Sequence, residues 1–148
     1  MCNIFNKKND YTIIVGCGNL GVNLATEIYE SDNDVLVIDS DENAIKNLPS
    51  NYGGLAIVSD GTDIDTLKEA NIEKATSVIA VTNDDNVNIM VSLLAREIFK
   101  IKNVIARLDN PDRKCIYEEF NIETICPTEL SSFAINDMLK ATYLKEVN

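Results

Sequence analysis

The chain has 148 residues, with 13 Lys and Arg against 24 Asp and Glu, and it contains no histidine. Without an imidazole, Ser-His-Asp catalysis, Cys-His catalysis and histidine-containing zinc sites are excluded. The formal net charge of −11 repels phosphate backbones and anionic lipid, so we expect neither nucleic acid nor a lipid surface to be the main partner.

Strand signals and helix signals alternate along the chain. Apolar runs rich in β-branched residues predict strands at 12–15, 35–39, 55–58, 77–82, 104–108 and 124–126. Helices are expected from the glycines at 16–21 to about Glu30, after Ser40, over 63–71, over 85–100, from Asn110-Pro111, and from Pro127-Thr128 to about 145. Apolar strands that alternate with helices predict an α/β fold, a doubly wound Rossmann-type parallel sheet in a single domain.

The last predicted helix has a wide apolar surface that no later segment covers. We divide the chain into an N-terminal extension (1–10), a nucleotide-binding lobe (11–127) and a C-terminal helix (128–148), with no C-terminal lobe. The helix either packs on its own sheet or crosses to a second subunit. We favour the second subunit, because the helix at 85–100 also has surplus apolar surface. The apolar residues of the last helix are Leu130, Phe133, Ala134, Ile135, Met138, Leu139 and Tyr143.

The sharpest motif is Gly16-Cys17-Gly18-Asn19-Leu20-Gly21, a G-x-G-x-x-G between a predicted strand and a predicted helix. Gly16 permits the tight turn, Gly18 lets a phosphate approach the backbone, and Gly21 lets the helix pack close to the strand. The free N–H groups of the helix N-terminus would hold the anion. The alternative is a strand–helix turn that holds no ligand.

Asp39 ends the second predicted strand, 18 residues after Gly21. A dinucleotide fold places a carboxylate at this position to accept the ribose hydroxyls. The same charge repels a 2′-phosphate and favours NAD over NADP. A turn or helix-capping carboxylate is the structural alternative.

Further polar residues follow later strands, at the edge where ligands of such sheets bind. Asp60 and Thr62 follow the third strand, and Val81 and Thr82 end the fourth. Asp60 could equally be a turn residue and Thr62 a helix cap. Arg107, within the fifth strand, would reach a phosphate or a carboxylate at a subunit interface, unless it is only an edge arginine that reaches solvent.

The sequence offers no catalytic set. There is no Tyr-x-x-x-Lys pair, no histidine to act as acid and no cysteine or carboxylate cluster with metal-ligand spacing. Cys17 lies beside a helix N-terminus, which could lower the pKa of its thiol, but we interpret it as a small filler residue. The chain is therefore interpreted as a nucleotide receptor that is not an enzyme and holds no metal.

We expect no signal peptide and no membrane span in this sequence. No run of 18 apolar residues is present, and the first ten residues, MCNIFNKKND, lack the apolar core of a signal peptide. The cysteines Cys2, Cys17, Cys115 and Cys126 form no C-x-x-C pair. These features predict a cytoplasmic protein with free thiols.

From about residue 11 to residue 145 the chain resembles the RCK/KTN family, the regulatory nucleotide-binding domains of Trk and Ktr potassium uptake systems and of some potassium channels. The V-T-x-D-D-x-x-N stretch followed by I-A-R is more specific than the glycines. The matching segments are IIVGCGNLG, VLVIDSDENAI, SDGTD, VIAVTNDDNVNIMVSLLARE, VIARLDNPD and ICPTELSS.

The resemblance implies a cytoplasmic gating subunit that lies at the inner face of the membrane through a potassium transporter subunit. Such domains form homodimers that assemble into rings, often octameric, and bind NAD, NADH, ATP, ADP or AMP. It places the phosphates on Gly16–Gly21, the ribose on Asp39 and the adenine near Asp60 and Thr62. It also includes Val81 and Thr82 of the fourth strand in the site, and Arg107 matches the arginine of I-A-R.

Two departures from the family pattern refine this expectation. Many members that respond to ATP carry arginine where this chain has Asn19, so NAD(H), AMP or ADP becomes more plausible. The second departure lies at the C-terminal side, where we expect no counterpart of the sites in the family's C-terminal lobe. A small NAD-dependent oxidoreductase, or a nucleotide-binding module with a soluble protein partner, remains the alternative function.

Overall fold

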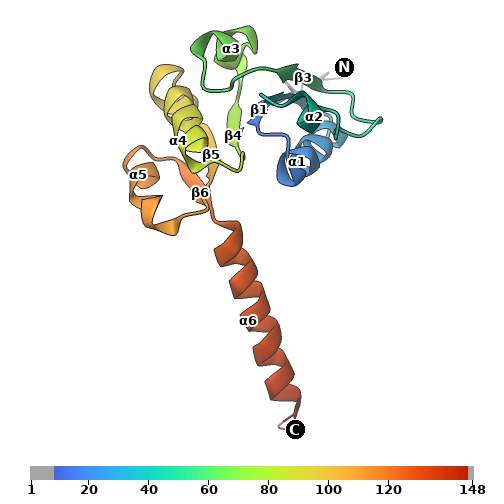
Figure 1. Cartoon of the computed structure of the whole chain (residues 1–148), viewed down its shortest axis with the longest axis vertical. Helices are drawn as coiled ribbons and strands as arrows, with labels where there is room; N and C mark the ends of the chain where they lie inside the picture. The colour runs from blue at the N-terminus through green and yellow to red at the C-terminus, as the bar shows by residue number, and fades with distance from the viewer. Residues whose placement is uncertain (1–8, 147–148) are drawn as a thin grey trace, which may run out of the picture.

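Six parallel strands form one sheet in the computed structural model, which describes residues 9–146. The strand order is β3-β2-β1-β4-β5-β6 (Figure 1). The chain therefore starts in the middle of the sheet, moves to one edge and returns to the other side of β1, which is the order of a Rossmann domain. The predicted fold class is confirmed. The strands are β1 (Tyr11–Val15), β2 (Asp34–Asp39), β3 (Leu55–Val58), β4 (Ser77–Ala80), β5 (Asn103–Arg107) and β6 (Glu123–Ile125).

Helices lie on both faces of the sheet (Figure 1). The apolar side chains of α1 and α2 form one core with β1 and β2, whereas those of α3, α4 and α5 form a second, larger core on the opposite face. The helices are α1 (Asn19–Glu30), α2 (Glu42–Ile45), α3 (Ile64–Glu69), α4 (Asp85–Leu93), α5 (Lys114–Glu119) and α6 (Pro127–Glu146).

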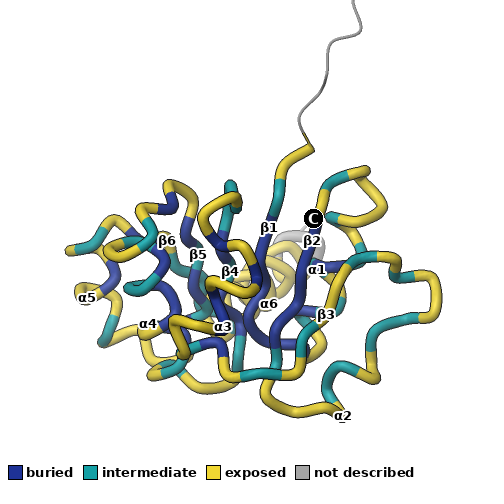
Figure 2. Tube along the Cα trace, turned by 90° about the horizontal axis from the view of Figure 1, so that it is seen from above, coloured by how far each residue is buried: buried dark blue, intermediate teal, exposed yellow. Residues whose placement is uncertain are grey.

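The continuous apolar character of the central strands follows from these two cores. In β1, Ile13 and Val15 join the larger core, while Ile14 between them joins the smaller one. Since both faces of β1 are buried, every position of the strand favours an apolar residue. Figure 2 shows the buried segments concentrated in the middle of the sheet.

The edge strand β3 departs from this pattern. Its sequence LAIV is as apolar as that of its neighbours, yet Leu55 and Val58 are exposed. The neighbouring helix α2 has only four residues, and one helical turn covers little of the sheet edge.

The predicted helix over 85–100 is two consecutive segments. α4 ends at Leu93, and Leu94–Ile98 continue as a π-helical turn. Val91 and Ala95 are buried in the larger core, but Met90 and Ile98 are exposed. The surplus apolar surface expected from the sequence is thus present on the single chain.

The helix α6 projects away from the sheet (Figure 1). Every residue from 128 to 143 is exposed, including Phe133 at 73% and Met138 at 69%. The interpretation in which this helix packs on its own sheet is therefore wrong. Its packing on a second subunit stays a prediction.

Replacing Gly21 with alanine should destabilise the fold. A methyl group there would collide with the carbonyl oxygen of Gly16, which the backbone holds in place. We expect the free energy of unfolding to fall by about 1–3 kcal/mol in urea titrations, the usual cost of overpacking. The control is Gly18→Ala, whose methyl group would meet nothing within 4 Å. Equal stability of the two variants would contradict the close α1–β1 contact.

Candidate functional site

The turn between β1 and α1 lies at the centre of the site and is held by its neighbours on both sides. Gly16 has a φ of +113°, a conformation that favours glycine, and a side chain there would lie 2.8 Å from the backbone nitrogen of Thr82. Hydrogen bonds from Gly16 N–H to the Ile38 carbonyl (2.8 Å) and from Val81 N–H to the Val15 carbonyl (2.8 Å) hold the turn between β2 and β4. The turn therefore lies at the switch point of the sheet.

The N-terminus of α1 carries no side-chain cap. Gly18 occupies the capping position, and the first turn contains no acidic residue. By contrast, an oxygen of Asp41, Asp63 or Asp84 accepts a backbone N–H at the start of α2, α3 or α4. The first N–H groups of α1 thus remain available to an anion, which the positive end of the helix dipole also favours.

Asp39 links this turn to the end of β2. Its Oδ2 accepts the Cys17 N–H at 2.7 Å, and its Oδ1 accepts the Asp41 N–H at 2.9 Å. Each carboxylate oxygen has two lone pairs, so both oxygens can still accept a hydroxyl hydrogen.

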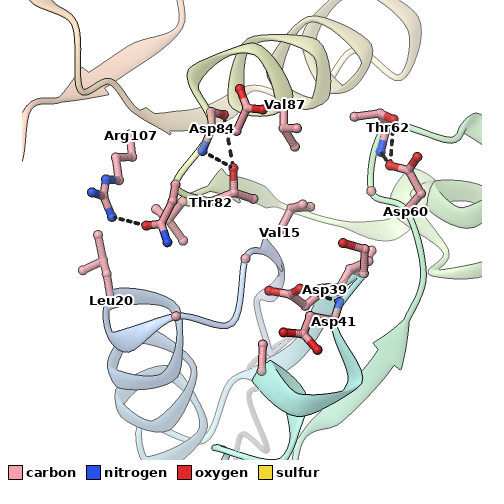
Figure 3. Close-up of a pocket in the computed structure, with 18 of the residues that line it drawn as sticks. Val15, Leu20, Asp39, Asp41, Asp60, Thr62, Thr82, Asp84, Val87 and Arg107 are labelled. Carbon is pink, nitrogen blue, oxygen red and sulfur yellow. Dashed lines mark hydrogen bonds between the residues drawn. The ribbon is translucent and has the colours of Figure 1, made fainter.

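A cavity of about 1030 Å³ opens above these residues, at the carboxyl ends of the strands. Figure 3 shows side chains from both halves of the sheet pointing into it. Ten of the twelve predicted site residues line it, namely Gly16, Gly18, Asn19, Leu20, Asp39, Asp60, Thr62, Val81, Thr82 and Arg107. Their roles in binding stay predictions.

The two remaining predicted residues, Cys17 and Gly21, do not line the cavity. The side chain of Cys17 is fully buried in the smaller core. Burial, with a contribution from the Asp39 carboxylate, raises the pKa of its thiol to about 11. The helix N-terminus, which could have lowered this pKa, is outweighed by desolvation. Cys17 is the filler residue that the sequence suggested, and its backbone N–H holds Asp39.

Asp60 and Thr62 form a local turn at the cavity wall. The Asp60 Oδ1 accepts both the N–H (2.8 Å) and the hydroxyl (2.7 Å) of Thr62. These two bonds stabilise the carboxylate and lower the pKa of Asp60. The cap of α3 is Asp63 rather than Thr62, so Thr62 is not the helix cap considered from the sequence.

Asn88, the last residue of the V-T-x-D-D-x-x-N stretch, has a structural role in the site that the sequence did not reveal. Its side chain is fully buried in α4, with an exposed fraction of 0%. Its Oδ1 accepts the N–H (2.9 Å) and hydroxyl (2.7 Å) of Thr82, and its Nδ2 donates to the carbonyls of Thr82 (3.0 Å) and Arg107 (3.1 Å). One amide thus joins the ends of β4 and β5. An asparagine amid the apolar residues of the predicted 85–100 helix was the available signal.

Acidic side chains outnumber basic ones around the cavity. Asp39, Asp41, Asp60 and Asp84 line it, and Arg107 is the single basic residue in its lining. The Arg107 guanidinium forms an ion pair with Asp109 (Nε to Oδ1, 3.0 Å) and donates from Nη1 to the Asn83 Oδ1 at 3.1 Å. The anion-attracting groups are therefore the α1 N-terminus and this arginine.

The fold and this cavity accompany a clear similarity to known proteins. The family model of the TrkA-N domain matches residues 12–127. The chain belongs to the TrkA-N family. The resemblance inferred from the sequence is thereby confirmed, and the matched TrkA-N segment contains all twelve predicted site residues.

A curated relative of this TrkA-N chain is the Trk system potassium uptake protein TrkA of Streptomyces coelicolor. It is 39% identical over 115 residues, which cover 78% of this chain and 52% of the relative. The chain thus spans about half the length of that protein.

Two solved structures share the TrkA-N fold. One is the GsuK channel bound to NAD, with a TM-score of 0.79 and 20% identity over 92% of this chain and 24% of that one. The other is the Shewanella denitrificans Kef CTD in AMP-bound form, with a TM-score of 0.73 and 17% identity over 91% and 81% of the two chains. At these identities the likeness concerns the fold.

Membrane-spanning helices and metal clusters are both absent from residues 9–146 of the TrkA-N chain. None of the helices in this range combines the length and the apolar character needed to cross a bilayer. In the same range, no three Cys, Asp or Glu side chains are grouped so as to hold a metal ion.

We expect Asn88→Asp to lower the free energy of unfolding by about 3 kcal/mol, measured by urea titration. A carboxylate cannot donate to the Thr82 and Arg107 carbonyls, and it would place a buried negative charge against those two carbonyl oxygens. The matched control is Asn23→Asp, which adds the same charge on an exposed position of α1. If Asn88→Asp is as stable as that control, the four hydrogen bonds of Asn88 do not stabilise the fold.

Proposed function

We propose that this chain is a nucleotide-sensing regulatory subunit of a Trk/Ktr-type potassium uptake system. The observation that carries the proposal is that a TrkA-N match coincides with an uncapped helix N-terminus and a ribose-type carboxylate at one cavity. Adenine nucleotides are the ligand class that fits these features. NAD or NADH is the preferred ligand, with ADP, ATP or AMP as alternatives.

The cavity suggests how the nucleotide lies. Its phosphates would rest on the backbone of Gly16–Gly21, where Gly18 leaves open space above the turn. The ribose hydroxyls would donate to Asp39. The adenine would lie between Asp60 and Thr62 on one side and Val81 and Thr82 on the other, near the ends of β3 and β4.

The charges of the lining support the order of preference among nucleotides. Asp39 and Asp41 stand together at the end of β2, and a 2′-phosphate there would meet two carboxylates. Asn19 in the phosphate loop brings no charge to a third phosphate. NAD and the nucleotides with fewer phosphates are therefore favoured over NADP and ATP.

Regulation would follow from assembly. We infer that residues 11–127 form the nucleotide-binding lobe and that the helix at 128–148 crosses to a second copy. We further propose that the homodimers join into a ring, with the octamer as the candidate size. A nucleotide that binds one ring conformation more tightly shifts the population towards it, by that difference in affinity and no more. The ring would act from the cytoplasm on a membrane-embedded potassium transporter subunit.

We further propose that the chain is not an enzyme. The sequence contains no histidine, and the lining of the cavity offers carboxylates, threonines and one paired arginine. These groups suit binding. A small NAD-dependent oxidoreductase remains the alternative, and steady turnover of NADH with a panel of small carbonyl compounds would favour it.

Asp39→Ala should weaken nucleotide binding by about 1–3 kcal/mol, because the ribose loses a charged acceptor. Calorimetry with NAD, NADH, ATP, ADP and AMP measures this change. The control is Asp63→Ala, which also removes a carboxylate and one backbone hydrogen bond but lies outside the cavity lining. Equal affinity of Asp39→Ala and the unmodified chain would show that the ribose assignment is wrong.

The proposed crossover predicts that a charge on α6 breaks the assembly. A helix turns once every 3.6 residues. At this spacing the apolar residues of α6 fall on most of the circumference of the helix, as in a helix buried on several sides. Met138 lies opposite Glu129 on the helix, and Met138→Asp should convert the assembly to monomers in light scattering, with an unchanged circular dichroism spectrum.

The matched control for this experiment is Asn136→Asp, which adds the same charge on the side that Glu129 and Lys140 share. A monomeric unmodified chain, or equal assembly of the two variants, would contradict the crossover.

A further inference from the structure

Arg107 is held in place by two acceptors at the edge of the cavity. Asp109 takes one side of the guanidinium with both oxygens, at 3.0 Å from Nε and 3.3 Å from Nη2, while Asn83 accepts from Nη1. A two-point contact of this kind is the strong geometry for arginine and a carboxylate. The pair is partly open to solvent, with side-chain exposures of 24% for Arg107 and 41% for Asp109.

The arginine faces the place where phosphates are expected. In Figure 3 its side chain lies opposite Leu20, in the first turn of α1, and both residues line the cavity. Every other charged side chain in the lining is an aspartate. Arg107 is therefore the one lining side chain that can attract an anion to this end of the cavity.

Asp109 opposes that attraction. An arriving phosphate either displaces the carboxylate from the guanidinium or approaches an ion pair whose charges cancel. Both routes make each added phosphate charge less favourable than it would be beside a free arginine. The Asp109 carboxylate consequently weakens the binding of ligands more strongly the more negative charge their phosphates carry. It leaves the recognition of adenine and ribose unaffected.

We propose that Asp109 is a specificity-determining residue that holds Arg107 and lowers the preference of the cavity for phosphate-rich nucleotides. This inference rests on the proposed nucleotide-binding function. A change of the Asp109 side chain should alter nucleotide preference without disturbing the local fold. The Asp109 backbone N–H donates to the Asp85 Oδ1 at 2.8 Å, and this hydrogen bond does not depend on the Asp109 side chain. Asp109→Asn therefore changes the charge and leaves that anchor intact.

The test is calorimetry of the full chain with AMP, ADP and ATP at low salt and without divalent cations. The quantity compared is the dissociation constant of AMP divided by that of ATP, which rises when ATP is bound relatively more tightly. We expect Asp109→Asn to raise this ratio about 3- to 10-fold, the range for one partly exposed charge pair. Asp109→Ala must also raise the ratio. The double variant Arg107→Gln, Asp109→Asn must not show the increase that Asp109→Asn causes alone.

The matched control is Asp112→Asn, which removes the same charge nearby. Asp112 is exposed, and its side chain forms no hydrogen bond or ion pair with the rest of residues 9–146. An Asp109→Asn ratio equal to that of the control, or below that of the unmodified chain, overturns the inference while nucleotide binding stands. If the unmodified chain and all variants bind none of the three nucleotides, the proposed function and this inference both fail.

Discussion

The close approach of three backbones at the end of β1 is the constraint on which the site depends. Gly16 touches the β4–α4 connection at Thr82, and Gly21 lies against the Gly16 carbonyl. Only residues without side chains permit both contacts. These contacts place the start of α1 at the carboxyl end of β1, between β2 on one side and β4 on the other. The cavity lies at that line because successive crossovers carry the chain away from it in opposite directions.

Different interactions fix the two walls of the cavity. The wall at β2 and α1 is fixed by backbone hydrogen bonds and the Asp39 carboxylate. The opposite wall is fixed by the buried amide of Asn88, which replaces four interactions with water by four within the protein. A fully satisfied polar group in an apolar core tolerates few alternative arrangements, so it defines the position of β4 against β5.

The sequence predicted the fold well because its strongest signals are local. β-Branched runs mark the strands, and the glycine motif marks the first turn, so the edge at which Asp39, Asp60 and Thr82 meet could be placed beforehand. What could not be predicted depends on contacts between distant residues. The role of Asn88 requires the position of Arg107, 19 residues away. The pKa of Cys17 depends on a core assembled from several elements, and the exposure of α6 depends on where the helix points.

The length of α6 gives it a mechanical consequence. The helix has 20 residues, which at 1.5 Å per residue make a rod of about 30 Å. Its first residue, Pro127, also lines the cavity. A tilt of about 10° about that point would carry the far end of such a rod roughly 5 Å, while atoms beside the cavity move by tenths of an ångström. Any rotation of α6 about its first residue would therefore be small at the cavity wall and large at the far end of the helix.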